Sequence, residues 1–164
     1  MRTKLLIGII SLFLFFIGFN NYQNFLSFFL DFIPELAIVY NTLWAQVLQS
    51  LFFGLLLSSI PILSLILWIK FKIQHNRIKI YIILLFLVSS IIASVARTLI
   101  LKCIYQRAFN AMPQPKPFIY DAENLNYNVY IFLGEIITFI LLYFILKKNQ
   151  KQEDKKINDK YLPL

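Results

Sequence analysis

The positions of lysine and arginine between the hydrophobic runs constrain this chain more than any other feature. Basic residues precede the first run, fill the short link after the second and follow the fourth, whereas residues 20–49 include acidic residues and no basic ones. Because short loops that stay in the cytoplasm retain Lys and Arg, this pattern predicts four transmembrane helices with both termini in the cytoplasm. The basic residues concerned are Arg2, Lys4, Lys70, Lys72, Arg77, Lys79, Lys147, Lys148, Lys151, Lys155, Lys156 and Lys160.

The composition agrees with a membrane location. Of the 164 residues, 59% are hydrophobic and 15% are charged, which leaves too little polar surface for a soluble domain of this size. The formal net charge of +8 falls mostly in the predicted cytoplasmic link and tail, where it suits contact with anionic lipid headgroups. No arginine cluster with interleaved aromatic residues is present, so nucleic-acid binding is not expected.

We therefore expect an all-α, polytopic membrane protein with a single membrane domain over residues 1–146. The tail at residues 147–164 is too polar and charged to fold alone, so we expect it to be disordered in the cytoplasm. The predicted spans cover about residues 5–19, 51–69, 80–101 and 129–146.

The segment at residues 24–49 has enough Phe and Leu for a fifth span, but it also contains Asp31, Pro34 and Glu35. An acid at mid-membrane costs about 2.5–3.5 kcal/mol on insertion scales. We therefore expect an interfacial helical segment in the first outer loop, divided at the proline. A re-entrant segment is the alternative.

Small and polar residues within the spans mark the faces on which helices, or a partner, should pack. Gly54 and Ser58 lie four residues apart in the second span, a spacing that lets helix backbones approach closely. Ser90, Ser94 and Arg97 share one face of the third span. The full set of candidate packing or partner-binding residues is Gly54, Ser58, Ser90, Ser94, Arg97, Glu135 and Thr138.

Two of these residues are ionisable, and an ionisable residue inside a span is a candidate functional site whose partner must be named. Arg97 lies near the outer end of the third span, and Glu135 lies deeper in the fourth. Because these spans are consecutive and antiparallel, Arg97 is the natural partner of Glu135. The alternatives are an Arg97 that reaches outward to the headgroups, and a protonated Glu135 bonded to Ser90 or Ser94.

Catalysis and metal binding find little support. His75 is the single histidine and Cys103 the single cysteine, so neither a metal-ligand cluster nor an internal disulfide is expected. Asp31 and Asp121 are both on the predicted outer side, where a membrane aspartyl hydrolase needs two acids. The characteristic motifs of lipoprotein signal peptidase are absent, however. We therefore expect no enzyme, no metal and no cofactor.

The layout of spans, basic link and basic tail resembles the immunity proteins of pore-forming bacteriocins, the colicin A/B/N type. Residues 32–34 (Phe-Ile-Pro), ahead of residues 40–48, are similar to the first outer loop of that family. Residues 61–73 (PILSLILWIKFKI) are similar to its second span and the start of its cytoplasmic link. The second outer loop, with prolines at 113, 115 and 117, departs from the family pattern.

The resemblance implies a multi-pass protein of the bacterial inner membrane that binds the pore-forming domain of a cognate bacteriocin and keeps its channel closed. The span faces named above would bind this partner. The competing hypothesis is a small accessory subunit of a larger membrane complex, and a transporter is disfavoured because no internal repeat is visible. The outer-loop residues expected to contribute to recognition are Asp31, Glu35, Asp121 and Glu123.

Overall fold

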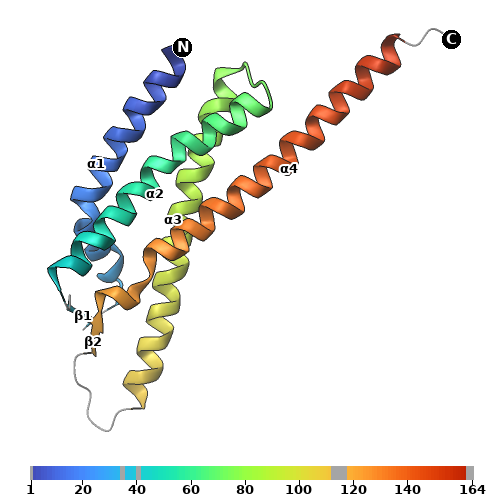
Figure 1. Ribbon diagram of the computed structural model, residues 1–164. Helices are drawn as coiled ribbons and strands as arrows, with labels where there is room; N and C mark the ends of the chain where they lie inside the picture. The colour runs from blue at the N-terminus through green and yellow to red at the C-terminus, as the bar shows by residue number, and fades with distance from the viewer. Residues whose placement is uncertain (1, 34–35, 40–41, 112–117, 162–164) are drawn as a thin grey trace.

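Four long helices account for most of the protein. The computed structural model describes all residues except 1, 34–35, 40–41, 112–117 and 162–164, which are drawn in grey in Figure 1. The helices are α1 (Arg2–Leu30), α2 (Leu43–Lys70), α3 (Asn76–Asn110) and α4 (Tyr127–Tyr161). Two short strands, β1 (Leu36–Val39) and β2 (Phe118–Asp121), and a 3-10 helix (Ala122–Leu125) lie in the connections between them.

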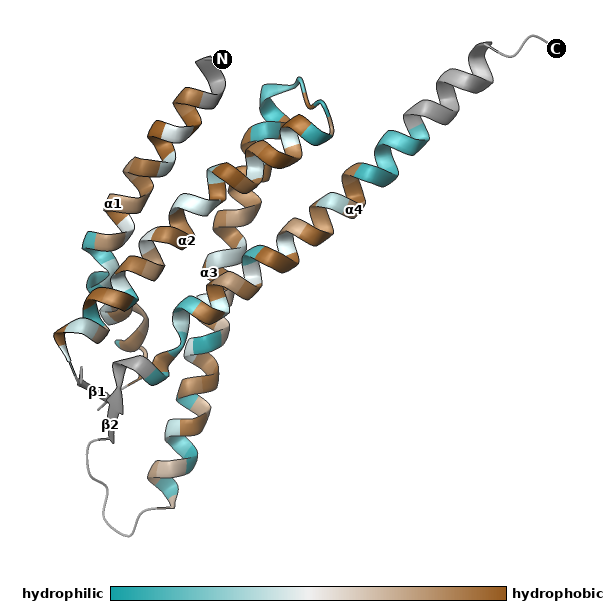
Figure 2. Ribbon diagram, viewed as in Figure 1, coloured by the Kyte–Doolittle hydropathy of each residue, from teal (hydrophilic) through white to brown (hydrophobic). Residues whose placement is uncertain are grey.

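All four helices are long and apolar enough to cross a membrane. The candidate spans are Leu5–Leu30, Leu43–Lys70, Asn76–Asn110 and Tyr127–Gln152. A helix rises about 1.5 Å per residue, so each span exceeds the roughly 20 residues that cross a hydrocarbon core. Hydrophobic residues extend over most of each helix in Figure 2, whereas polar residues gather at the α2–α3 link and on the turns of α4 that precede its grey end. The predicted number of spans is confirmed, and the fold is that of a multi-pass membrane protein.

The helices alternate in direction along the chain. The N-terminus, the α2–α3 link and the far end of α4 therefore lie toward one end of the bundle, and the two strands lie at the other end (Figure 1). The closest helix partners are α1 with α2 and α3 with α4, and α2 also contacts both α3 and α4. The last part of α4 projects away from the other helices (Figure 1).

Each of the two main helix pairs has a glycine at a point of close contact. Where α1 crosses α2, a Cβ atom added to Gly18 would lie 2.9 Å from Gly54 Cα, and one added to Gly54 would lie 2.8 Å from the carbonyl oxygen of Phe15. Where α3 meets α4, a Cβ atom added to Gly134 would lie 3.1 Å from Ala93 Cβ. Small residues thus permit the close backbone approach on which helix association in lipid depends. Gly54, a predicted packing residue, lies at the first of these crossings.

Two hydrophobic clusters fill the bundle. The cluster nearer the strands combines all four helices and includes Tyr22, Phe53, Leu101 and Tyr127. The cluster nearer the link contains Ile60, Leu67, Ile82, Phe86 and Leu142, from α2, α3 and α4 alone. The first half of α1 is therefore much less covered by protein than its second half.

The helix boundaries correct the first two predicted spans. The span expected at residues 5–19 continues to Leu30, so residues 24–30 are part of α1 and not of a separate interfacial helix. Residues 36–39 form β1, and residues 43–49 begin α2. Two contacts explain the longer α1: Asn21 donates its amide hydrogen to the carbonyl of Ile17, and Leu26 is buried in the bundle. The helix ends one residue before Asp31, which is exposed, so α1 places no carboxylate in the apolar region.

The other boundaries also lie outside those predicted. The start of α2 is eight residues before position 51, because the Thr42 side chain caps it by accepting a hydrogen bond from Ala45 N. The third and fourth helices are likewise longer than the predicted ranges 80–101 and 129–146. In place of the disordered tail expected from residue 147, α4 continues to Tyr161. That stretch contains no Gly or Pro and is rich in Lys, Gln and other good helix formers.

The strands form one short parallel pairing, which the sequence did not lead us to expect. Leu36 is opposite Phe118 and Val39 is opposite Asp121. Parallel strands need a long crossover connection, and α2 and α3 together supply it here. The pairing joins the α1–α2 and α3–α4 connections into one unit at the end of the bundle away from the termini (Figure 1).

Candidate functional site

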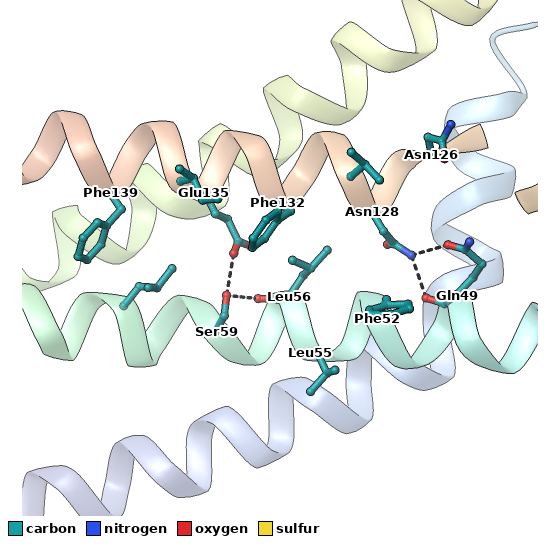
Figure 3. Close-up of a pocket in the computed structure, with 13 residues that line it drawn as sticks. Gln49, Phe52, Leu55, Leu56, Ser59, Asn126, Asn128, Phe132, Glu135 and Phe139 are labelled. Atoms are coloured by element: carbon teal, nitrogen blue, oxygen red, sulfur yellow. Dashed lines mark hydrogen bonds between the residues drawn. The ribbon is translucent and has the colours of Figure 1, made fainter. Parts of the chain in front are cut away.

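A groove of about 650 Å3 lies between α2 and α4, with walls that are mostly apolar. Figure 3 shows the residues of the two helices that face each other across it. Several wall side chains are also exposed on the outside of the bundle, among them Phe52 (48%) and Phe132 (52%). The groove is therefore open along its side to whatever surrounds the helices. Its polar lining residues are Gln49, Ser59, Asn126, Asn128 and Glu135.

Glu135 is the most deeply buried polar side chain of the groove, with 2% of its surface exposed. Its Oε2 atom accepts a hydrogen bond from Ser59 Oγ at 2.7 Å. The same hydroxyl lies 2.7 Å from the carbonyl oxygen of Leu56 in its own helix. The other carboxyl oxygen, Oε1, is buried and has no hydrogen-bond partner among the described residues. Since a buried polar atom without a partner is costly, this carboxyl group is only partly satisfied by the protein.

A second polar contact links the helices at the strand end of the groove. The Nδ2 atom of Asn128 donates to the backbone oxygen of Gln49 at 3.0 Å and to its Oε1 at 2.7 Å (Figure 3). The Tyr22 hydroxyl of α1 reaches the same Gln49 Oε1 at 3.5 Å. Asn128 Oδ1 is buried without a partner in the described part of the chain. Asn128 and Glu135 lie seven residues apart, which places them on one face of α4 about 10.5 Å apart along its axis.

Arg97 belongs to a different site. Its Nε atom donates to the carbonyl oxygen of Leu125 at 2.6 Å, and Nη2 donates to that of Asn124 at 3.0 Å. Its guanidinium carbon lies 5.1 Å from the centre of the Tyr130 ring. Arg97 thus holds the end of the 3-10 helix against α3. The pairing with Glu135 that we considered from the sequence is not formed, because each residue has other partners.

The remaining candidates in the spans bond mainly within their own helices. Ser58, Ser90 and Ser94 donate to the carbonyls of Leu55, Phe86 and Ser90 respectively. Ser90 and Ser94 therefore bond within α3. The hydrogen-bond partner of Glu135 is Ser59 on α2. Thr138 is partly buried on α4 and does not line the groove.

The described members of the predicted outer-loop set, Asp31, Asp121 and Glu123, lie at the strand end. Asp31 is exposed just after α1, and the backbone of Asp121 is in β2 opposite Val39. Glu123 is in the 3-10 helix. The contacts of the Asp121 and Glu123 side chains, and Glu35 altogether, lie outside the described residues. The strand pairing brings the two loops that carry these acids together.

Sequence reasoning missed Gln49, Ser59 and Asn128 as site residues. A signal for the two residues on α2 exists: positions 49, 52, 56, 59 and 63 repeat at helical spacing, and all five line the groove. It was hidden because the second span was expected to begin at residue 51, which left Gln49 in the interfacial segment of the first outer loop. Hydropathy alone also could not show that α4 would face α2 as well as α3.

The polar groups of the groove can form hydrogen bonds, and one of them can carry a charge. Across the residues described, no group of three or more His, Cys, Asp or Glu side chains is close enough to hold a metal ion. The groove has one carboxyl group, one hydroxyl and three amide side chains on apolar walls. A nucleophilic serine needs a base that is in turn oriented by a third group, and no lining residue supplies that third group to Ser59. The groove can therefore bind a molecule through hydrogen bonds and apolar contacts.

Comparison of the chain with known protein families, characterised proteins and solved structures found no match. What the protein does is therefore inferred from the contacts of its own residues.

Proposed function

We propose that this protein is an immunity protein of the bacterial inner membrane, which binds the pore-forming domain of a bacteriocin and prevents its channel from opening. Its termini and the α2–α3 link would lie in the cytoplasm. Lys70, Lys72, Arg77 and Lys79 lie in the link or in the helix turns beside it, and such positive charge is retained on the cytoplasmic side. The strand end of the bundle would then face the periplasm, from which such a toxin arrives.

The observation that carries this proposal is the β1–β2 pairing. It joins two connections that lie about 80 residues apart in the sequence and so builds a single surface at one end of the bundle. Arg97 fixes this surface to α3 through the carbonyls of Asn124 and Leu125. A binding surface that is ordered before the partner arrives loses less conformational entropy on binding. Two joined loops can also select one partner and reject others.

The helices would supply the second part of the interaction. Their outward faces are apolar, so a hydrophobic helix of the toxin can lie against them within the bilayer. In lipid, such helix contacts depend on close packing and on hydrogen bonds, not on the exclusion of water. A binding function of this kind needs no catalytic group.

The test is protection of a sensitive bacterium. Cells that express the chain are challenged with a panel of pore-forming bacteriocins, and survival and membrane potential are measured. We expect survival against one toxin with the potential maintained, while the others still kill. If the protein is inserted in the membrane and no toxin is resisted, the proposal fails; co-purification would then test the accessory-subunit hypothesis.

A matched pair of variants tests whether the strand end is the recognition surface. Asp31→Lys reverses a charge on an exposed residue at that end, and Lys148→Glu reverses one on an exposed residue of α4 at the other end. We expect Asp31→Lys to reduce protection by about tenfold in the toxin dose tolerated, since like charges placed in an interface repel. Lys148→Glu should leave protection unchanged, because the neighbouring Lys147 and Lys151 keep that end of α4 basic. Equal effects of the two changes would argue against recognition at the strand end.

A further inference from the structure

We propose that the groove between α2 and α4 is a binding site for a lipophilic organic cation that carries N–H donors. This site is separate from the strand end, and the inference does not depend on the immunity function. Three features of the groove support it: two buried acceptor atoms without partners among the described residues, no counter-charge for Glu135 among the described lining residues, and aromatic walls open on one side.

The first feature defines what the ligand must donate. Both Glu135 Oε1 and Asn128 Oδ1 are buried, and neither has a hydrogen-bond partner in the part of the chain that the structure describes. The orientation of the Asn128 amide is fixed because its Nδ2 faces a backbone carbonyl oxygen, which can only accept. Its Oδ1 is therefore an acceptor, and so is Glu135 Oε1 when the carboxyl group is ionised or carries its proton on Oε2. A ligand with N–H donors satisfies both positions.

The second feature is charge. Ser59 has a single hydroxyl hydrogen but lies 2.7 Å from both Glu135 Oε2 and Leu56 O, so it cannot fully serve both oxygens. None of the described residues that line the groove is Lys, Arg or His. A carboxylate in apolar surroundings is unfavourable unless an opposite charge lies beside it. A bound cation supplies that charge, whereas an anion would be repelled.

The third feature is shape. The volume of about 650 Å3 is within the range of small-molecule sites and well below that of a whole helix. The rings of Phe52, Phe132 and Phe139 line the walls, and Figure 3 shows Phe132 beside the Glu135 carboxyl group. The face of an aromatic ring attracts a cation. Because the groove is open along its side, a lipophilic cation can enter it directly from the bilayer.

A neutral lipid tail is the competing occupant. It would fill the apolar part of the groove equally well, but it would leave Oε1 of Glu135 and Oδ1 of Asn128 without partners. The two occupants therefore predict different dependence on Glu135. Binding of a cation requires the carboxyl group, and binding of a tail does not.

Ethidium is a suitable probe, because it is a lipophilic cation with two aromatic amino groups and its fluorescence rises when it is shielded from water. The purified full-length chain in phosphatidylcholine nanodiscs would be titrated with ethidium, with empty nanodiscs as the reference for partitioning. We expect saturable binding in excess of the empty discs. The anionic fluorophore 1-anilinonaphthalene-8-sulfonate should show no saturable binding to the same site. Ethidium binding equal to that of empty discs overturns the proposal.

The variant Glu135→Gln keeps the size of the side chain and removes its negative charge. We expect about tenfold or greater loss of ethidium affinity, as is typical when a charged hydrogen-bond partner is lost. Thr138→Ala is the matched control, because Thr138 is on α4 but does not line the groove. The affinity of this variant for ethidium should equal that of the wild type. Unchanged affinity in Glu135→Gln means that only a neutral apolar site is present, and the proposal fails.

A second variant covers the case in which Glu135→Gln does not fold. Phe132→Leu keeps the wall apolar and removes one ring, so a cation should bind about threefold more weakly. Elution profile and circular dichroism establish that each variant is folded before binding is compared. If Phe132→Leu binds ethidium as well as the wild type does, the aromatic contribution to the site is excluded and the cation assignment fails with it.

Discussion

Two buried ionisable residues, Arg97 on α3 and Glu135 on α4, show how differently the protein treats charge inside its bundle. Arg97 is 7% exposed, and two of its donors are used by the carbonyls of Leu125 and Asn124. Glu135 is 2% exposed, and one of its two oxygens has no partner among the described residues. The first residue holds a connection in place. The second residue has unfilled hydrogen-bonding capacity, as residues at functional sites often do.

The difference also teaches how each region is stabilised. Around Arg97, polar groups are matched to one another: Thr98 Oγ1 lies 2.8 Å from the Tyr127 hydroxyl and also donates to Ser94 O. Around Glu135, α3 and α4 are held by close contact at Gly134, where Ser89 Oγ also donates to the Gly134 carbonyl, and otherwise by apolar side chains. We therefore expect stability to depend on hydrogen bonds near Arg97 and on packing near Glu135. The predictions below test this contrast, from the largest effect to the smallest.

The largest effect is expected for Arg97→Met. The change removes the donors of two carbonyls, of which that of Leu125 belongs to a fully buried residue. Loss of a charged donor with its partners left unpaired lowers the free energy of unfolding by about 2–4 kcal/mol. The free energy of unfolding is measured by denaturing the detergent-solubilised chain and monitoring its circular dichroism. Arg107→Met, at an exposed position on the same helix, is the control and should change the free energy of unfolding little.

Gly134→Val should have the next largest effect. A Cβ atom at this position would lie 3.1 Å from Ala93 Cβ and 3.2 Å from Ser89 Oγ, so α3 and α4 would have to move apart. Overpacking of this kind costs about 1–3 kcal/mol. The same change at Gly8, where an added Cβ meets nothing within 4 Å, is the control. If both valines were tolerated equally in the denaturation assay, the region around Glu135 would not depend on close packing.

Tyr127→Phe should have a smaller effect, because it removes a single hydrogen bond. The hydroxyl lies 2.8 Å from Thr98 Oγ1, and Thr98 keeps its bond to Ser94 O in the variant. The free energy of unfolding should fall by about 1 kcal/mol. Because Tyr127 and Thr98 act as a pair, the double variant with Thr98→Val should cost less than the sum of the two single changes. Strict additivity would mean that this hydrogen bond does not stabilise the Arg97 region.

Hydropathy and charge were enough to predict the number of spans, because both depend only on local sequence. The helix ends were not predicted, because hydropathy stops at the first polar residues. Asn21, for example, satisfies its amide on the carbonyl of Ile17 and lets α1 continue. The polar residue lowers the local hydropathy, although its hydrogen bond lets the helix continue. A prediction from apolar runs therefore ends the helix too early.

The candidate site was predicted in part for a related reason. Glu135 could be identified as a buried acid from the sequence, but its partner could not. Consecutive helices were expected to pair, which favoured α3, whereas Ser59 on α2 is 76 residues away in the chain. The β1–β2 pairing joins even shorter segments over a similar separation. Contacts of this kind depend on how whole helices are placed, which no local pattern records.

Glu135→Leu is expected to have the smallest effect on stability, and it is the sharpest test of the contrast. The variant replaces a partly satisfied carboxyl group by an apolar side chain in an apolar groove, and Ser59 keeps its bond to Leu56 O. Replacing a buried polar group in this way is nearly neutral or slightly stabilising, within about 1 kcal/mol. Binding of ethidium should nevertheless be lost. If the variant is as stable as the wild type but no longer binds ethidium, the role of Glu135 is binding. If it loses as much stability as Arg97→Met does, both residues are structural, and the distinction between the two regions is lost.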